Sequence, residues 1–311
     1  RDYRRKEDDP LYLINAELGL SKGKVVIPTG LVAGQKLGYH LRRLTWPASS
    51  VQDFDRLPIP YRAVAADIET GEVVVLGSGD LARALRARMA IPGFFSAVEW
   101  EGRLLVDGGV ARNLPVDVVR KMGAEVVIAV DISTPLAKRD DLKGFLGILG
   151  QTTGFLTRLN VENQIATLRG RDLLIAPDLE GIATLGFPRF GEAIDRGEAA
   201  GRAAAERLRE FSVSPEEYAA WKAAHTPLFT DETPEIAELR VDTAGRVDPD
   251  IVSHRVRVTP GRLDWNTLYE SLEGVYAFGD YETVDFLIEG PRDRRVLTIE
   301  PRIAAEAPTR L

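Results

Sequence analysis

The residues best suited to acid–base chemistry in this sequence lie in one turn, Asp107-Gly108-Gly109. A predicted strand over 103–106, apolar from Leu104 on, leads into the aspartate, and the pattern predicts a helix over 115–122 beyond the turn. A carboxylate placed where a strand ends could serve as a general base. Asp-Gly is also among the commonest turn dipeptides, because Asp bonds its own backbone and Gly tolerates positive φ. The turn alone leaves both interpretations open.

Composition removes several classes of function. The chain has 311 residues, is 44% hydrophobic and 28% charged, and carries a net charge of −7, which allows one large domain and a small one. No stretch is dense in Lys or Arg, so we expect no nucleic-acid partner. The absence of cysteine excludes thiolate sites, and three scattered histidines argue against a metal centre or a Ser–His triad. We therefore expect neither a metal nor a cofactor.

The ends and the hydropathy of the chain are informative as well. No run of about 18 apolar residues, the length that a membrane-spanning helix needs, occurs in the sequence. The chain opens with the polar stretch RDYRRKEDDP, which is unlike a natural N-terminus or a signal peptide. We expect the sequence to be part of a longer protein.

The elements before the turn predict a β-hairpin. Two β-rich runs, 61–68 and 72–76, flank a short polar turn that ends in Gly71, and a helix is predicted over 81–89.

The elements after the turn predict a sheet covered by helices. The stretch AEVVIAVDI, 124–132, is typical of a strand buried on both faces. With the strand at 103–106 and the helix at 115–122 it predicts a βαβ unit, and hence a layered α/β fold. Further helices are predicted over 145–168 and 190–211, and a short strand over 173–176.

The C-terminal quarter predicts a second, smaller domain. Residues 212–233 mix prolines, acids and hydroxyl residues and are interpreted as a linker with one short helix. Residues 234–303 follow the order β-α-α-β-β, with Asp248 and Asp264 as helix N-caps. This α+β unit is large enough to fold by itself.

Several stretches in order carry a family resemblance: DFDRLPIPYRAVAADIETGE, ALRARMAIPGFF, LLVDGGVARNLPVDVVRKMGA and VVIAVDIS. On these, residues 25 to about 210 resemble the patatin-like acyl hydrolases. Residues 234–303 resemble a POTRA domain, the periplasmic module that precedes outer-membrane barrels. The resemblance implies a patatin-like domain over 1–211 that is N-terminally incomplete, a linker over 212–233, a POTRA-like domain over 234–303, and a tail over 304–311 leading towards a barrel absent from this chain.

The resemblance also implies a mechanism. The family uses a Ser–Asp dyad without histidine, in which the Ser lies in a G-x-S-x-G elbow and the Asp lies in a DG[GA] turn. By position, Asp107 is then the general base, and Gly108 and Gly109 let the backbone place it. A glycine-rich loop upstream would supply the oxyanion donors.

The sequence departs from the family pattern at the nucleophile. It contains no G-x-S-x-G; Ser78 lies in LGSGD, and the stretch 150–154, GQTTG, has Thr in the nucleophile position but lies within a helical pattern. We expect the first strand, the oxyanion loop and the nucleophile to lie before Arg1. Arg88 occupies a position where the family usually has a small Ser, so either its guanidinium reaches solvent through the vacant N-terminal region or this member has departed from the working pattern.

Three hypotheses follow. In the first, the intact protein is a serine acyl hydrolase, a phospholipase or lipase carried as the passenger of a bacterial outer-membrane protein. Its partners would be a phospholipid or other lipid ester and a membrane surface, and a homodimer is compatible with the sequence. In the second, the chain is a non-catalytic remnant that binds a partner through its POTRA-like domain. In the third, it is a cytoplasmic patatin-like regulator with an unrelated C-terminal domain. Activity of these 311 residues by themselves stays open, because the nucleophile is not among them.

Overall fold

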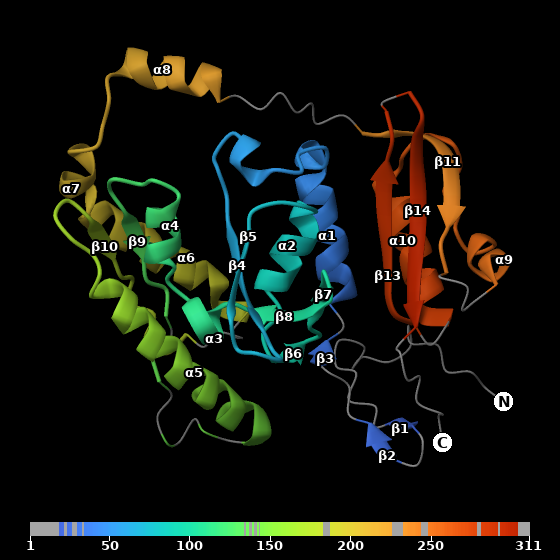
Figure 1. Ribbon diagram of the computed structural model, residues 1–311, viewed down its shortest axis with the longest axis horizontal. Coiled ribbons are helices and arrows are strands. Elements are labelled where there is room, and N and C mark those ends of the chain that lie inside the picture. The colour runs from blue at the N-terminus through green and yellow to red at the C-terminus, as the bar shows by residue number, and fades with distance from the viewer. Residues whose placement is uncertain are drawn as a thin grey trace. The chain divides into compact units, whose positions relative to one another are not determined.

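The chain folds into mixed α/β structure, as the sequence predicts, and forms two compact units (Figure 1). The computed structural model describes residues 19–21, 24–26, 30–32, 34–133, 135, 136, 139, 142, 144–182, 187–225, 233–243, 248–278, 281–291 and 293–303. Unit 1 comprises residues 1–54, 78–98 and 228–311, and unit 2 comprises residues 55–77 and 99–227.

These units cross the predicted boundary at residue 211, because two N-terminal segments group with the C-terminal residues. Whether the predicted domains are separate folding modules stays a prediction. The predicted tail over 304–311 and residues 226–232 of the predicted linker lie outside the described residues.

A four-stranded sheet with the order β5-β4-β8-β7 holds the Asp107 turn. Its strands are β4 (Ala63–Asp67), β5 (Val73–Leu76), β7 (Val98–Trp100) and β8 (Arg103–Asp107). The predicted hairpin is confirmed: β4 and β5 pair antiparallel, and Gly71 adopts φ 74° in the turn between them. All five residues of β4 are buried, so the strand beside β8 is a fixed support.

The strand predicted over 124–132 is shorter and less buried than expected. β9 (Ile128–Val130) pairs in parallel with β10 (Leu173–Ile175) in a separate two-stranded sheet. The prediction of burial on both faces is wrong, since Ile128 is 46% and Val130 is 48% exposed while Ala129 is buried. Ala129 packs against the helix residues Val116 and Val161. An apolar run does not by itself report how many faces of a strand are covered.

The predicted βαβ unit is also wrong in its connection, because β8 and β9 belong to different sheets. The crossover instead joins β9 to β10 through α5 (Gly144–Ile165). The core between α5, β9 and α4 consists of Leu114, Val116, Val127, Ala129 and Val161.

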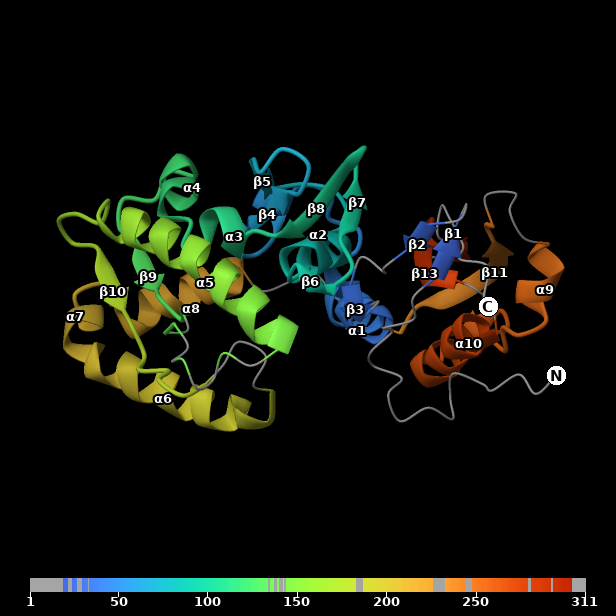
Figure 2. The same ribbon diagram turned by 90° about the horizontal axis from the view of Figure 1, so that it is seen from below.

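The remaining helices of unit 2 are short or follow one another closely. They are α3 (Gly109–Arg112), α4 (Val116–Lys121), α6 (Phe190–Ala203), α7 (Ala205–Arg209) and α8 (Pro215–Ala224). A 3-10 turn at Phe187–Arg189 precedes α6, and another at Phe54–Arg56 lies where the sequence passes from unit 1 to unit 2. The helix predicted over 190–211 is divided at Ala204 into α6 and α7. Figure 2 shows α5 and α6, of 22 and 14 residues, as the long helices of this unit.

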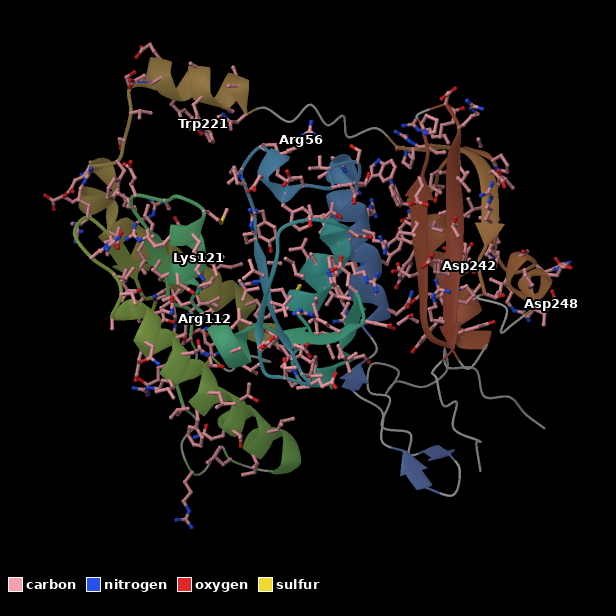
Figure 3. All side chains as sticks on the ribbon, in the orientation of Figure 1. Arg56, Arg112, Lys121, Trp221, Asp242 and Asp248 are labelled. Atoms are coloured by element: carbon pink, nitrogen blue, oxygen red, sulfur yellow. The ribbon has the colours of Figure 1, made fainter. Side chains whose placement is uncertain are left out.

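The short helix predicted within the linker is α8, and its start is well determined. Ser214 and Glu217 form a capping box, each side chain bonding the other residue's backbone N–H. Its side chains are exposed; the Trp221 ring, labelled in Figure 3, stacks on His225 with 4.5 Å between the centroids. The capping box, and not burial, fixes where this helix begins.

Unit 1 contains the predicted C-terminal elements in the predicted order, with one added strand. They are β11 (Glu235–Val241), α9 (Pro249–Ser253), β12 (Gly261–Arg262), α10 (Trp265–Phe278), β13 (Tyr281–Glu289) and β14 (Arg295–Ile303), and the sheet order is β12-β11-β14-β13. Asp248 and Asp264 cap α9 and α10, as predicted. The likeness of this part to a POTRA domain stays a prediction.

The N-terminal elements of unit 1 are two small sheets and two helices. They are β1 (Gly19–Ser21) paired with β2 (Lys24–Val26), β3 (Gly30–Val32) paired with β6 (Gly93–Phe95), α1 (Gln35–Thr45), the 3-10 turn Trp46–Ala48, and α2 (Leu81–Arg88).

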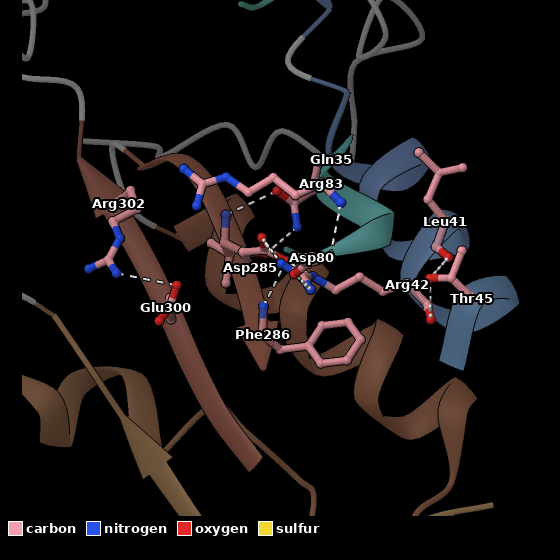
Figure 4. Close-up of polar contacts among 11 residues, drawn as sticks. Gln35, Leu41, Arg42, Thr45, Asp80, Arg83, Asp285, Phe286, Glu300 and Arg302 are labelled. Atoms are coloured by element: carbon pink, nitrogen blue, oxygen red, sulfur yellow. Dashed lines mark hydrogen bonds and ion pairs between the residues drawn. The ribbon is translucent and has the colours of Figure 1, made fainter. Parts of the chain in front are cut away.

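Helix α1 contacts the edge strand β13 through polar groups (Figure 4). The Gln35 side-chain amide bonds both backbone groups of Val284, accepting from its N–H at 2.9 Å and donating to its carbonyl. Arg42 reaches Asp285 and Asp80 at 2.6 Å each. Burial acts to lower the pKa of Arg42, and the two carboxylates overcome this and raise it. The contact ties α1, α2 and the C-terminal sheet into one unit.

Candidate active-site turn

Asp107 is the last residue of β8 and lies half-buried opposite Ala65 of β4. Its Oδ1 accepts a 2.6 Å hydrogen bond from the backbone N–H of Gly109, the first residue of α3. This is the bond of an ordinary Asx turn. The carboxylate therefore stands at the end of a strand, as the sequence predicts, in a geometry that a purely structural aspartate would share.

Space, and not backbone conformation, requires glycine at position 108 and leaves little room for a side chain at position 109. Gly108 adopts an ordinary helical φ of −66°, but a Cβ there would lie 2.2 Å from the carbonyl oxygen of Val64 on β4. A Cβ on Gly109 would lie 3.0 Å from Asp107 Oδ1 and 3.1 Å from Asn113 Oδ1. The chain can approach β4 this closely only with glycine at 108.

Helix α5 braces the turn with side chains that the sequence analysis did not identify. Thr157 Oγ1 donates to the Gly109 carbonyl at 3.1 Å, and Asn160 Nδ2 donates to the same oxygen at 2.9 Å. Asn160 Oδ1 accepts from the backbone N–H of Asn113 at 2.8 Å. The partners lie about 50 positions apart in sequence, and the only local signal was a pair of weak helix formers within a long helix.

The same face of α5 also holds the start of α4. The buried Gln164 accepts from the N–H of Asp117 at 3.1 Å. Arg112, labelled at the end of α3 in Figure 3, pairs with Asp117 at 3.2 Å. The positions 157, 160 and 164 repeat with helical spacing and form one polar stripe.

Neither of the serine or threonine motifs forms a nucleophile elbow. Ser78 lies in the loop between β5 and α2, where it forms an isolated bridge with Asp53. The 150–154 stretch lies inside α5, and Thr152 and Thr153 donate to helix carbonyls four residues earlier. The interpretation of this stretch as helical is confirmed.

Arg86 of α2 is partly buried, and Arg88 is exposed. This exposure agrees with the alternative in which the Arg88 side chain reaches solvent, and whether this member has departed from the working pattern stays a prediction. The Arg86 guanidinium donates to the Ser96 carbonyl at 3.1 Å and lies 5.2 Å from the centroid of the Phe95 ring. Burial lowers the pKa of Arg86 to about 10.

The described residues also bear on metal binding and on membrane insertion. No group of three or more His, Cys, Asp or Glu side chains among them could hold a metal ion. No helix in the described part of the chain combines the length and hydrophobicity needed to cross a membrane.

Comparison with known proteins places the turn inside a recognised family region. Residues 43–120 match the family model described as Patatin-like phospholipase. Lysophospholipase NTE1 of Scheffersomyces stipitis is 27% identical over 177 residues, which are 50% of this chain and 11% of that protein. Patatin-like phospholipase domain-containing protein 7 of Mus musculus is 30% identical over 175 residues, 49% of this chain and 13% of the relative.

A bacterial relative shows higher identity over a shorter range. An uncharacterized NTE family protein of Mycobacterium tuberculosis is 36% identical over 104 residues, 33% of this chain and 28% of that protein. The chain thus spans between 11% and 28% of the length of these relatives. It carries patatin-like phospholipase sequence around the Asp107 turn and has relatives in the NTE family.

Proposed function

We propose that this chain is part of a patatin-like serine acyl hydrolase that cleaves the ester bonds of phospholipids or related lipids, with Asp107 as the general base. The observation that carries the proposal is the placement of Asp107. It lies at the end of a strand, in a turn braced by α5, and within the residues that match the phospholipase family model. The relatives named as lysophospholipases support a lipid ester as the substrate class.

The proposed chemistry needs one carboxylate and one hydroxyl. Asp107 takes the proton of a serine hydroxyl as the serine oxygen bonds to the ester carbonyl carbon. The tetrahedral intermediate then collapses, the ester C–O bond breaks, and the leaving alkoxide receives the proton from Asp107. Water repeats the two steps on the acyl-enzyme and releases the fatty acid. The serine is proposed to come from a G-x-S-x-G segment outside these 311 residues, which contain none.

The Gly109 bond is compatible with this task. A carboxylate offers about four lone-pair sites, so an N–H donor on Oδ1 leaves the group able to accept a proton.

The test is hydrolysis of phospholipid vesicles by the full-length protein and its Asp107→Asn variant. General-base catalysis is worth about 10²–10⁴-fold, and we expect a loss in that range. Asp131→Asn is the matched control, because Asp131 also follows a strand and accepts the N–H two residues on, from Ser133 at 2.9 Å. Equal rates for Asp107→Asn and Asp131→Asn would remove Asp107 from the mechanism.

The proposed setting is the bacterial outer membrane, with the active site in the periplasm or at the cell surface. It is supported by the order β11-α9-β12-α10-β13-β14, which agrees with the POTRA-like pattern in the sequence. Recovery of the protein in a cytoplasmic fraction would instead favour a regulator with an unrelated C-terminal domain.

A second candidate function is binding through the C-terminal sheet, and β11 favours it. Among the described residues β12 pairs only with Glu235 and Ile236, so the outer side of β11 beyond them has no strand neighbour there. The opposite edge, β13, is contacted by Gln35. A strand from a partner would therefore add to β11. This function is preferred if the full-length protein and its Asp107→Asn variant are equally inactive on lipid esters.

A further inference from the structure

The turn that carries Asp107 has little stiffness of its own. Two consecutive glycines follow the aspartate, and glycine has the largest backbone freedom of any residue. The helix that follows, α3, has four residues, and no side chain caps it at Gly108. Such a segment needs support from elsewhere to hold one conformation.

Asn160 supplies that support at both ends of α3. Its amide nitrogen donates to the carbonyl of Gly109 at 2.9 Å, and its amide oxygen accepts from the N–H of Asn113 at 2.8 Å. The same nitrogen also donates to the Leu156 carbonyl at 3.0 Å, which fixes the side chain on its own helix. Asn160 therefore spans the short helix from its first residue to the residue after its last.

The hydrogen bonds of Asn160 are connected to the Asp107 carboxylate through Gly109. Gly109 gives its N–H to Asp107 and its carbonyl to Asn160, so one glycine connects the two side chains. Rotation of Gly109 about its φ or ψ changes the direction of its N–H relative to its carbonyl, so the residue can keep both bonds only within a narrow range of these angles. By holding the carbonyl, Asn160 restricts that rotation and so favours the conformation in which the N–H meets Asp107.

We propose that Asn160 is a positioning residue that sets the orientation of the Asp107 carboxylate through Gly109. This inference rests on the proposed function for its importance to catalysis, but its structural content can be measured without any activity. Asn160 is 53 positions from Asp107, and the link between them is the hydrogen-bonded path described above.

The two bonds of Asn160 can be separated by substitution. Asn160→Ala removes both. Asn160→Asp keeps an acceptor for Asn113 and removes the donor to Gly109. Thr157 still donates to the Gly109 carbonyl in each variant, which favours retention of the fold. Thr152→Ala is the control, since Thr152 lies on α5 and its hydroxyl donates to the Ile148 carbonyl of the same helix.

The experiment uses the 311-residue chain and NMR. Amide hydrogen exchange is followed at Gly109 and Asn113, and the Asp107 carboxyl carbon is titrated. We expect Asn160→Ala to speed exchange at both amides about tenfold, the equivalent of one hydrogen bond. Asn160→Asp should speed exchange at Gly109 and leave Asn113 protected. The pKa of Asp107 should rise in both variants, because its charged form loses a well-held donor.

Unchanged exchange at Gly109 and an unchanged Asp107 titration in Asn160→Asp would overturn the inference. If Asn160→Ala does not fold, Asn160→Asp and Thr157→Val carry the test, and the same two readouts decide it. In the full-length enzyme, Asn160→Asp should lower kcat with KM unchanged. Full activity of Asp107→Asn would refute the proposed function, whereas the NMR result would still decide whether Asn160 positions Asp107.

Discussion

The substitution Gly108→Ala adds a single methyl group and is the most severe test of the geometry of the turn. The added Cβ would lie 2.2 Å from the Val64 carbonyl oxygen and 2.6 Å from its carbon, whereas ordinary contacts begin near 3.4 Å. The gap must therefore open by more than 1 Å. Both sides of it are backbone, and Val64 lies in a strand buried along its whole length, so no flexible side chain can move aside.

Overpacking of this kind costs about 1–3 kcal/mol, and we expect the upper end, about 3 kcal/mol, because the clash is between main chains. The assay is urea unfolding, read as a shift in midpoint at constant slope. Gly150→Ala is the matched control: Gly150 lies in α5 with nothing within 4 Å of its Cβ position, so alanine there should stabilise by about 1 kcal/mol.

The two substitutions thus have opposite expected signs. A Gly108→Ala variant as stable as the wild type would show that the turn does not press against β4 as described. The same variant should also lose lipid hydrolysis in the full-length protein, because the backbone shift moves Asp107.

Two further predictions concern charges that are not part of the turn. Asp172 accepts backbone N–H bonds and pairs with Arg120, and these contacts lower its pKa to about 2. This folded-state pKa lies below the unfolded value of about 3.9. The contribution of Asp172 to the free energy of unfolding is therefore complete above the unfolded value and is lost as the pH falls towards 2. Asp172→Asn should therefore be less stable than the wild type at about pH 6 in urea unfolding, with the two curves converging in acid, and a pH-independent difference would contradict this. Arg42→Met should destabilise the protein by about 1–3 kcal/mol, because it removes the cation that Asp80 and Asp285 share. Both carboxylates are partly exposed, so water compensates for some of the loss. A wild-type urea midpoint for Arg42→Met would show that the ion pairs joining α1 to β13 contribute nothing to unit 1.

Local signals in the sequence predicted local structure well. The hairpin β4–β5 was identified from two β-rich runs and a turn ending in Gly71, and that turn has the positive φ that glycine favours. The helix starts at Asp248 and Asp264 were identified from capping patterns, and both side chains accept the expected N–H bonds. Each of these features depends on a few neighbouring residues.

Burial and sheet membership were harder to predict. The stretch that contains β9 is nearly all apolar, and apolar runs occur both in strands covered on one face and in strands covered on two. Which face is covered depends on α5, which begins 14 residues beyond β9. For the same reason the pattern could not show that β8 and β9 belong to different sheets.

The candidate site was predicted only in part. Asp107 and its glycines were identified from the turn and the family resemblance, and their placement at the end of β8 is now visible. The assignment of catalysis to Asp107 stays a prediction. The sequence around Asn160 does not indicate its role. An asparagine within a helix supports a turn only when the folded chain brings backbone groups such as those of α3 within hydrogen-bond distance of it.

The central claim is that Asp107 removes the proton of the nucleophile, and single-turnover acylation tests it most directly. In the full-length protein, the rate of acyl-enzyme formation should fall by about 10²–10⁴-fold in Asp107→Asn and stay at the wild-type value in Asp131→Asn. A wild-type acylation rate in Asp107→Asn would contradict the account.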